Sequence, residues 1–180
     1  PIESLWIRVD SPEDFEMIPE ASEAVSSLVP YLTLEIAPEI DLQSLSKGMP
    51  QNSLPLALLR DFGDRDYSQY IRFLRICSDF NAIPIAGLGP DCEDGIFSEP
   101  ASNLIVTLRA NLLPVPPFHE IGIYRRLAEK LRTWRNASPI WIRNGRIPSG
   151  EQTGFLDRLL DASLLSGSLL CDGIGDLVSI

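Results

Sequence analysis

The sequence predicts an α/β fold in which parallel strands alternate with helices. Short apolar, β-branched runs recur roughly every 20 to 30 residues, and segments with apolar side chains at helical spacing separate them. The run from Leu54 to Leu59 is apolar on both faces, as in a parallel sheet that helices cover. A (βα) barrel-like fold of the TIM type, complete or incomplete, fits this pattern, and an open doubly wound sheet is the alternative.

The pattern predicts six or seven strands along the chain, with right-handed crossovers between them. The expected strands are Leu5 to Val9, Leu32 to Ile36, Leu54 to Leu59, Ala82 to Ala86, Asn103 to Leu108, Pro139 to Ile142 and the terminal run that contains Leu169 and Leu170. The expected helices are Ser11 to Leu28, Leu42 to Leu45, Tyr67 to Ser78, Ile121 to Trp134 and Ser149 to Ala162. Pro114, Pro116 and Pro117 predict an extended stretch before the longest helix.

Length and charge limit the class of protein. The chain has 180 residues, 44% of them apolar, which suffices for one domain over residues 1–180, and its abrupt ends suggest a part of a longer multidomain chain. Asp and Glu number 25 against 15 Lys and Arg, so the net charge is -10. Such a surface repels polyanions, which argues against nucleic acid or an anionic membrane as a partner. No apolar run is long enough to span a membrane, and no signal peptide is visible.

The cysteines do not form a metal-binding pattern. Cys77, Cys92 and Cys171 are widely spaced without a C-x-x-C pair, and His119 is the only histidine. Neither a zinc site nor an iron-sulfur cluster can be assembled from this segment alone. We expect free thiols in a reducing compartment, with Cys171 facing the core and His119 packed at the start of the long helix.

Four arginines form the main candidate site. Arg8, Arg60, Arg109 and Arg143 each come at or near the end of an expected strand in a chain that is poor in basic residues. The carboxyl ends of parallel strands meet at one edge, where ligands bind in α/β folds, and guanidinium groups suit phosphate. These arginines therefore predict an anion pocket if they converge. The alternative is that they are solvated loop residues, neutralised by the acids beside them in the sequence.

The terminal segment contains residues that could form the other part of this anion pocket. Asp172, Gly173, Gly175 and Asp176 follow the apolar run that ends at Leu170. Two glycines one residue apart let the backbone turn tightly and expose N–H groups to an anion. The alternative is a tight turn between two hydrophobic segments that binds nothing.

Two further patterns have weaker implications. Asp61, Asp64 and Asp66 could hold magnesium, but a solvated acidic loop explains them better in so acidic a chain. Gly87 and Gly89 match half of a dinucleotide fingerprint, without the helix that the fingerprint requires.

One tetrapeptide occurs almost twice. Leu5-Trp6-Ile7-Arg8 is nearly repeated as Ile140-Trp141-Ile142-Arg143, each at an expected strand. No longer period supports a duplication, so we interpret the repeat as a coincidence.

The terminal motif resembles that of a known enzyme family. Leu169 to Asp176, read as L-L-C-D-G-I-G-D, is similar to the L-L-x-D/E-G-I/L-G-D signature of 4-hydroxy-3-methylbut-2-enyl diphosphate synthase. In that family the signature falls late in a (βα)8 barrel. Plants and some bacteria carry a larger form with a second, barrel-like domain inserted between the catalytic barrel and the cluster domain. The chain resembles this insert, over about a dozen residues of motif and otherwise in architecture only.

The resemblance implies a structural role. The parent enzyme would convert methylerythritol cyclodiphosphate to hydroxymethylbutenyl diphosphate in isoprenoid biosynthesis, with a [4Fe-4S] cluster and electrons from ferredoxin or flavodoxin. Cluster and substrate residues would belong to other domains of the same polypeptide, so this segment would carry no catalytic residue. It would lie in the bacterial cytoplasm, or in the plastid stroma of a plant. The alternatives are a stand-alone barrel enzyme and a binding module for a small phosphorylated ligand.

Overall fold

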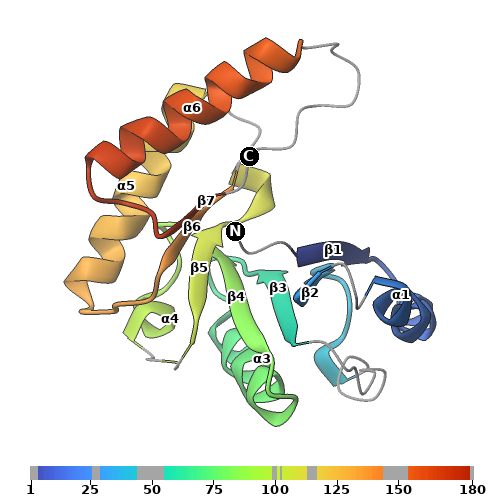
Figure 1. Cartoon of the computed structure of the whole chain (residues 1–180). Coiled ribbons are helices and arrows are strands. Elements are labelled where there is room, and N and C mark those ends of the chain that lie inside the picture. Colours follow the sequence, from blue (N-terminus) through green and yellow to red (C-terminus); the bar gives the residue numbers. More distant parts are fainter. Residues whose placement is uncertain are drawn as a thin grey trace.

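A computed structural model describes residues 4–25, 29–43, 55–98, 101, 103–112, 117–143 and 154–178. Its seven strands form one parallel sheet in the sequential order β1-β2-β3-β4-β5-β6-β7. The sheet is curled into a half-barrel with helices on its outer side (Figure 1). The predicted α/β class and the incomplete barrel-like architecture are thereby confirmed. A doubly wound sheet would reverse its strand order at a switch point, and this sheet does not.

The strands are short, as in most parallel sheets of this size. They are β1 (Ser4–Val9), β2 (Tyr31–Ile36), β3 (Leu56–Asp61), β4 (Ile83–Leu88), β5 (Ile105–Leu108), β6 (Ile140–Ile142) and β7 (Leu177–Val178). The helices are η1 (Pro12–Met17), α1 (Ile18–Val25), α3 (Tyr67–Asp79), α4 (Asp94–Ser98), η2 (Ala110–Leu112), α5 (Pro117–Thr133) and α6 (Phe155–Cys171). No helix in these ranges is both long and apolar enough to cross a membrane.

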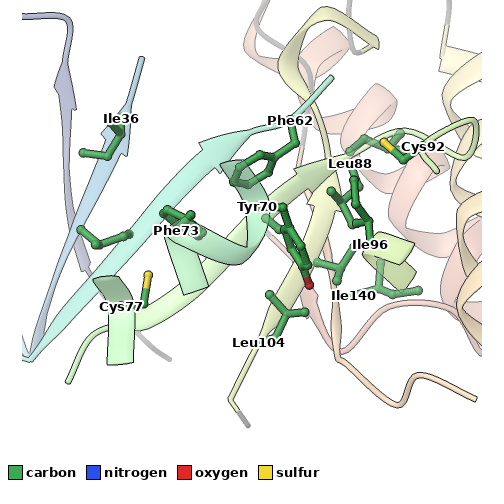
Figure 2. Packing of buried hydrophobic residues seen from close by; sticks show 14 of the residues in the cluster. Ile36, Phe62, Tyr70, Phe73, Cys77, Leu88, Cys92, Ile96, Leu104 and Ile140 are labelled. Atoms are coloured by element: carbon green, nitrogen blue, oxygen red, sulfur yellow. The ribbon is translucent and has the colours of Figure 1, made fainter. Parts of the chain in front are cut away.

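The main core lies between the outer face of the sheet and the helices. Phe62, directly after β3, contacts two aromatic rings of α3 (Figure 2). Its ring centroid is 5.5 Å from that of Tyr70 and 5.4 Å from that of Phe73, both in edge arrangements. These three side chains are at most 2% exposed, so they anchor α3 on β3 and β4.

The other face of the sheet carries a smaller apolar cluster made of strand residues. Trp6 of β1 and Trp141 of β6 belong to the two nearly identical tetrapeptides, and both lie on this concave face. Their ring centroids are 5.4 Å apart, although four strands separate β1 from β6 in the sheet. The sheet is therefore curled strongly enough for its first and sixth strands to touch through side chains.

The structure corrects several expected elements. Leu169 and Leu170 belong to α6, and β7 begins only at Leu177. Leu169 and Leu170 are helical because they continue the apolar pattern of the two preceding helical turns. The prediction considered the two leucines without those turns. Pro117 begins α5, where its missing N–H costs nothing, so the extended stretch does not reach that residue.

Some expected elements fall on or beyond the limits of the described residues. The predicted start of the last helix at residues 149–152 lies outside the described ranges, as does the second half of the short helix from Leu42 to Leu45, whose first two residues are helical. Within them, β3 and β4 begin one or two residues later than predicted and end two residues later. The acidic stretch after Gly89 contains the short helix α4.

Candidate functional site

The structure separates the two halves of the predicted anion pocket. Arg60, Arg109 and Arg143 lie at the carboxyl ends of β3, β5 and β6, at one edge of the sheet. Residues 172–176 connect the end of α6 to the start of β7, at the opposite edge, where Asp176 binds the backbone of Ile140 at the start of β6. The expectation that the arginines meet this loop is therefore wrong.

Arg143 is the most buried of the four arginines. Its side chain is 5% exposed. Nη2 donates to the carbonyl oxygen of Leu108 at 2.5 Å, and Nε donates to Thr107 Oγ1 at 3.2 Å. The Thr107 hydroxyl in turn donates to the carbonyl oxygen of Trp141 at 2.8 Å. Arg143 thus joins β5 to β6 through the protein's own acceptors.

Tyr124 of α5 extends this network to the helix layer. Its hydroxyl accepts the backbone N–H of Arg143 at 2.9 Å and donates to the Trp141 carbonyl at 3.3 Å. Burial raises the pKa of Tyr124, so the hydroxyl stays protonated and can do both. Sequence reasoning missed this residue, because Tyr124 occupies an ordinary core position in the amphipathic pattern of the helix.

Asp61, the last residue of β3, is the acid of this edge. Its Oδ2 accepts the backbone N–H of Ala110 at 2.6 Å, and its Oδ1 is 3.5 Å from Arg143 Nη2. The carboxylate lies directly over Gly87, where a Cβ atom would come within 1.8 Å of Oδ1. Burial raises the pKa of Asp61, and the Ala110 hydrogen bond and the charge of Arg143 act against that rise. Gly87 is therefore needed to seat Asp61 rather than to bind a dinucleotide.

Arg60 holds the turn that follows β2. Nη1 donates to the Ile40 carbonyl at 2.8 Å and Nη2 donates to the Pro38 carbonyl at 2.7 Å. The residue is 6% exposed, and burial lowers its pKa. Its hydrogen bonds satisfy backbone carbonyls that would otherwise be buried without a donor.

Arg109 pairs with the loop after β3. Its Nη1 is 2.9 Å from Asp64 Oδ1 and donates more weakly to the Phe62 carbonyl at 3.4 Å. Nε is buried and has no hydrogen-bond partner among the described residues. Among the described arginines at this edge, Arg109 is thus the one with a buried guanidinium nitrogen that lacks a hydrogen-bond partner.

Arg8 lies at the outer strand and is largely solvated. Its Nε is 2.6 Å from Asp10 Oδ1, and Nη1 is 3.6 Å from Glu35 Oε1. The hydrogen bond that Arg8 donates to the Asp10 carboxylate is the main cause that raises the pKa of Arg8. The alternative that acids beside the arginines in the sequence neutralise them holds for Arg8, whereas the partner of Arg109 is Asp64 on a distant loop.

The loop at the other edge is a helix-ending motif. The N–H of Ile174 donates to the Leu169 carbonyl at 2.9 Å, and the N–H of Gly173 donates to the Leu170 carbonyl at 3.0 Å. Gly173 has a φ of 70° and Ile174 is buried, which are the features of a Schellman motif with its apolar contact. The backbone donors that a phosphate cradle would need are thus partly committed to α6.

The two acids of this loop bind the protein itself. Asp172 Oδ2 accepts from Arg125 Nε at 2.7 Å, which ties the loop to α5. Asp176 Oδ2 accepts the N–H of Ile140 at 2.9 Å, and the N–H of Asp176 donates to the Ile140 carbonyl at 2.9 Å. Gly175 has a φ of 107°, which lets the chain turn into β7 between these contacts.

The cysteines lie apart on different elements. Cys77 and Cys92 are buried, and burial raises the pKa of both thiols. Cys171 at the end of α6 is exposed, so the expectation that it faces the core is wrong; His119 is exposed as well. In the described ranges, no three His, Cys, Asp or Glu side chains are arranged to hold a metal ion. The cysteines do not fit an iron-sulfur cluster.

One buried acid escaped the sequence analysis. Glu120 in the first turn of α5 is 5% exposed, and burial, with the nearby charge of Asp161 on α6, raises its pKa to about 7. Its position at the start of a helix is typical of a solvated acid, so no local pattern in the sequence indicates its burial.

Comparisons with known proteins add no family to these observations. No protein-family model matches the chain, and no curated protein matches it.

Proposed function

We propose that residues 1–180 form a non-catalytic structural domain. The observation that carries this proposal is the engagement of the strand-end arginines by the protein's own acceptors. Arg60 and Arg143 donate to backbone carbonyls, and Arg8 and Arg109 pair with acids beside them. A phosphate group would have to break these contacts before it could bind, so the edge serves to join strands and loops.

The parent that we propose is 4-hydroxy-3-methylbut-2-enyl diphosphate synthase in its larger form, with this domain as the insert. The terminal signature from Leu169 to Asp176 supports the proposal, together with the barrel-like sheet. Its residues end and cap α6 and lead into β7, a role that a barrel keeps without catalysis. Other domains of the polypeptide would hold the [4Fe-4S] cluster, receive electrons from ferredoxin or flavodoxin, and bind substrate. The compartment would be the bacterial cytoplasm or the plastid stroma.

Kinetics of the full-length enzyme test this proposal. The double variant Arg109→Ala with Arg143→Ala should lower the unfolding temperature but, measured well below it, leave KM for the cyclic diphosphate unchanged. Arg125→Ala, an exposed arginine that pairs with Asp172, is the matched control for loss of charge. A severalfold rise in KM only in the double variant would show that the edge binds substrate. A full-length gene product without a clustered cysteine set outside residues 1–180 would remove the proposed parent.

One observation favours the alternative of a phosphorylated ligand. Arg109 Nε and Asp61 Oδ1 are buried without hydrogen-bond partners among the described residues. A ligand that carries both an anionic oxygen and a donor could satisfy them together. Arg109→Ala alone would then abolish binding of a small phosphate ester that the wild-type domain binds.

A further inference from the structure

The outer side of α6 is apolar. Five of its leucines are between 39% and 64% exposed, and we call them the α6 leucine stripe. They are Leu156, Leu159, Leu160, Leu164 and Leu170. The side that packs on the domain is made of Ala162, Leu165 and Leu169. A helix on the outside of a barrel normally turns polar residues to water, and a contiguous apolar surface of this kind marks a contact site.

The stripe runs along the outer side of α6. Its members Leu156, Leu159 and Leu170 are turned away from α5, whereas Leu160 and Leu164 lie nearer to that helix. Asp161 acts on Glu120 of α5 and so marks the side toward that helix. At helical spacing, Leu159 and Leu170 fall on the side opposite Asp161. In a barrel each outer helix packs against two neighbours, and α6 has α5 as one of them. In the described part of the chain, α5 is the helix that packs on α6 (Figure 1).

The sheet is unpaired on the same side. In the described part of the chain, no strand pairs with the outer edge of β1 or of β7. The Val9 carbonyl accepts from Ala37 on the β2 side, so the alternate residues Trp6 and Arg8 turn their N–H groups to the outer edge. Likewise Asp176 bonds to Ile140, which leaves the N–H of Leu177 facing outward.

The curl of the sheet limits what can lie between the unpaired outer edges of β1 and β7. Trp6 and Trp141 are in contact across the concave face, so β1 and β7 are brought toward each other rather than splayed. A parallel barrel of this type closes with eight strands, and the described part of the chain contributes seven. One further strand is therefore the unit that fits, with a helix beside α6 to connect it by a right-handed crossover.

We propose that a helix and one parallel strand from another part of the same polypeptide cover the α6 leucine stripe and pair with β7 and β1. This inference rests on the proposed function, in which the domain is one part of a longer chain. The helix presents an apolar face to the stripe and extends the ring in which α5 already packs on α6. The strand closes the barrel, and together they fix this domain to its neighbours.

The thiol of Cys171 reports on this contact. It is exposed and adjoins Leu170 at the end of the stripe, whereas Cys77 and Cys92 are buried and serve as internal controls. In the full-length polypeptide, Leu156→Lys with Leu159→Lys should raise the alkylation rate of Cys171 at least about tenfold, read by peptide-resolved mass spectrometry. Glu129→Lys, which adds a lysine at an exposed position of α5, should leave that rate unchanged.

Hydrogen exchange reports on the strand. In the full-length chain the amides of Trp6 and Arg8 should exchange about as slowly as the amide of Ile7, which β2 already protects. Exchange of Trp6 and Arg8 more than about a hundredfold faster than Ile7 would overturn the proposal. So would a Cys171 that reacts at the same rate in the wild type and in the double lysine variant.

Two other outcomes have defined meanings. A full-length protein that sediments as a dimer and becomes a monomer with the double lysine change would show that a second copy covers the stripe, which overturns the inference. Fast exchange of Trp6 and Arg8 with an unchanged KM in the Arg109 and Arg143 variants would defeat this inference and leave the proposed function standing. A raised KM with slow exchange would defeat the proposed function alone.

Discussion

The two edges of the sheet use charged residues in opposite ways. At the carboxyl edge, Arg60, Asp61 and Arg143 are largely buried and bind backbone groups. At the amino edge, Asp172 and Asp176 are exposed, and the backbone conformations of two glycines set the turn. The carboxyl edge therefore depends on polar contacts that water cannot replace, whereas the amino edge depends mainly on φ angles and on capping.

The largest difference between the two edges should be in the unfolding free energy that is lost when one arginine is removed at each edge. Arg143→Ala leaves the Thr107 and Leu108 acceptors without their donor, raises the pKa of Asp61 further and should cost about 3 to 5 kcal/mol of unfolding free energy. Arg125→Ala removes an exposed pair with Asp172 and should cost less than about 1 kcal/mol. Urea unfolding measures both; equal costs would contradict the distinction between the edges.

A buried acid near the carboxyl edge should make stability depend on pH. Glu120 has a folded pKa raised from 4.5 to about 7, so its neutral form is favoured in the fold. The contribution of Glu120 to the stability of the fold is greatest below about pH 4.5. It falls as the pH rises through 7 and remains lower at higher pH. Glu120→Gln should remove this loss and stabilise the domain at pH 8 by about 2 to 3 kcal/mol, with little effect near pH 4.5.

The control for this pH effect is Glu129→Gln, an exposed acid on the same helix. Unfolding midpoints of both variants between pH 4.5 and 8 give the comparison. A Glu120→Gln variant with the pH dependence of the wild type would show that Glu120 is solvated.

The amino edge should be sensitive to glycine substitution. Gly175→Ala combines a φ of 107° with a Cβ that would lie 2.4 Å from Ile142 Cδ1, and should cost about 2 kcal/mol. Gly173→Ala meets open space at a φ of 70° and should cost about 1 kcal/mol. Chemical unfolding of the two variants checks the order, and a Gly173→Ala variant that is the more damaged of the two would contradict the steric argument.

The smallest effect should be a gain in stability. α5 ends in the same motif as α6, but with Arg135 at a φ of 53° in the place of Gly173. Arg135→Gly relieves that strain and should stabilise by about 0.5 kcal/mol, net of the entropy that glycine loses. Asn81→Gly at the end of α3 is the control and should gain less, since asparagine tolerates this conformation better. A lower melting temperature for Arg135→Gly would refute the expectation.

Much of the fold was predictable because its signals are local. The apolar runs at β2, β3 and β5 and the amphipathic pattern of α5 follow from side-chain period alone. The alternation of strands and helices predicts parallel pairing, but it fits both a sequential and a doubly wound strand order, and only the structure decides between them. The terminal motif was misplaced because Leu169 and Leu170 suit a strand as well as a helix, and only the preceding turns of α6 decide between them.

The candidate site was less predictable because the burial of a side chain depends on its tertiary surroundings and not on its residue type alone. Arg8 and Arg143 each end nearly the same tetrapeptide. Arg8 is nevertheless solvated and pairs with Asp10, whereas Arg143 is buried and donates to the Leu108 carbonyl. The difference arises because β1 is an edge strand and β6 is an inner strand. Likewise the contact of Trp6 with Trp141 depends on the curl of the whole sheet, which no local pattern reports.

Calorimetric titration of the wild-type domain with inorganic diphosphate tests the central claim most directly. If the arginines of the carboxyl edge serve the fold, the domain should give no saturable heat at millimolar diphosphate, because each guanidinium group already binds acceptors of the protein itself. A saturable heat that disappears in the Arg109→Ala and Arg143→Ala double variant, measured while that variant is still folded, would contradict the account and make this edge a binding site.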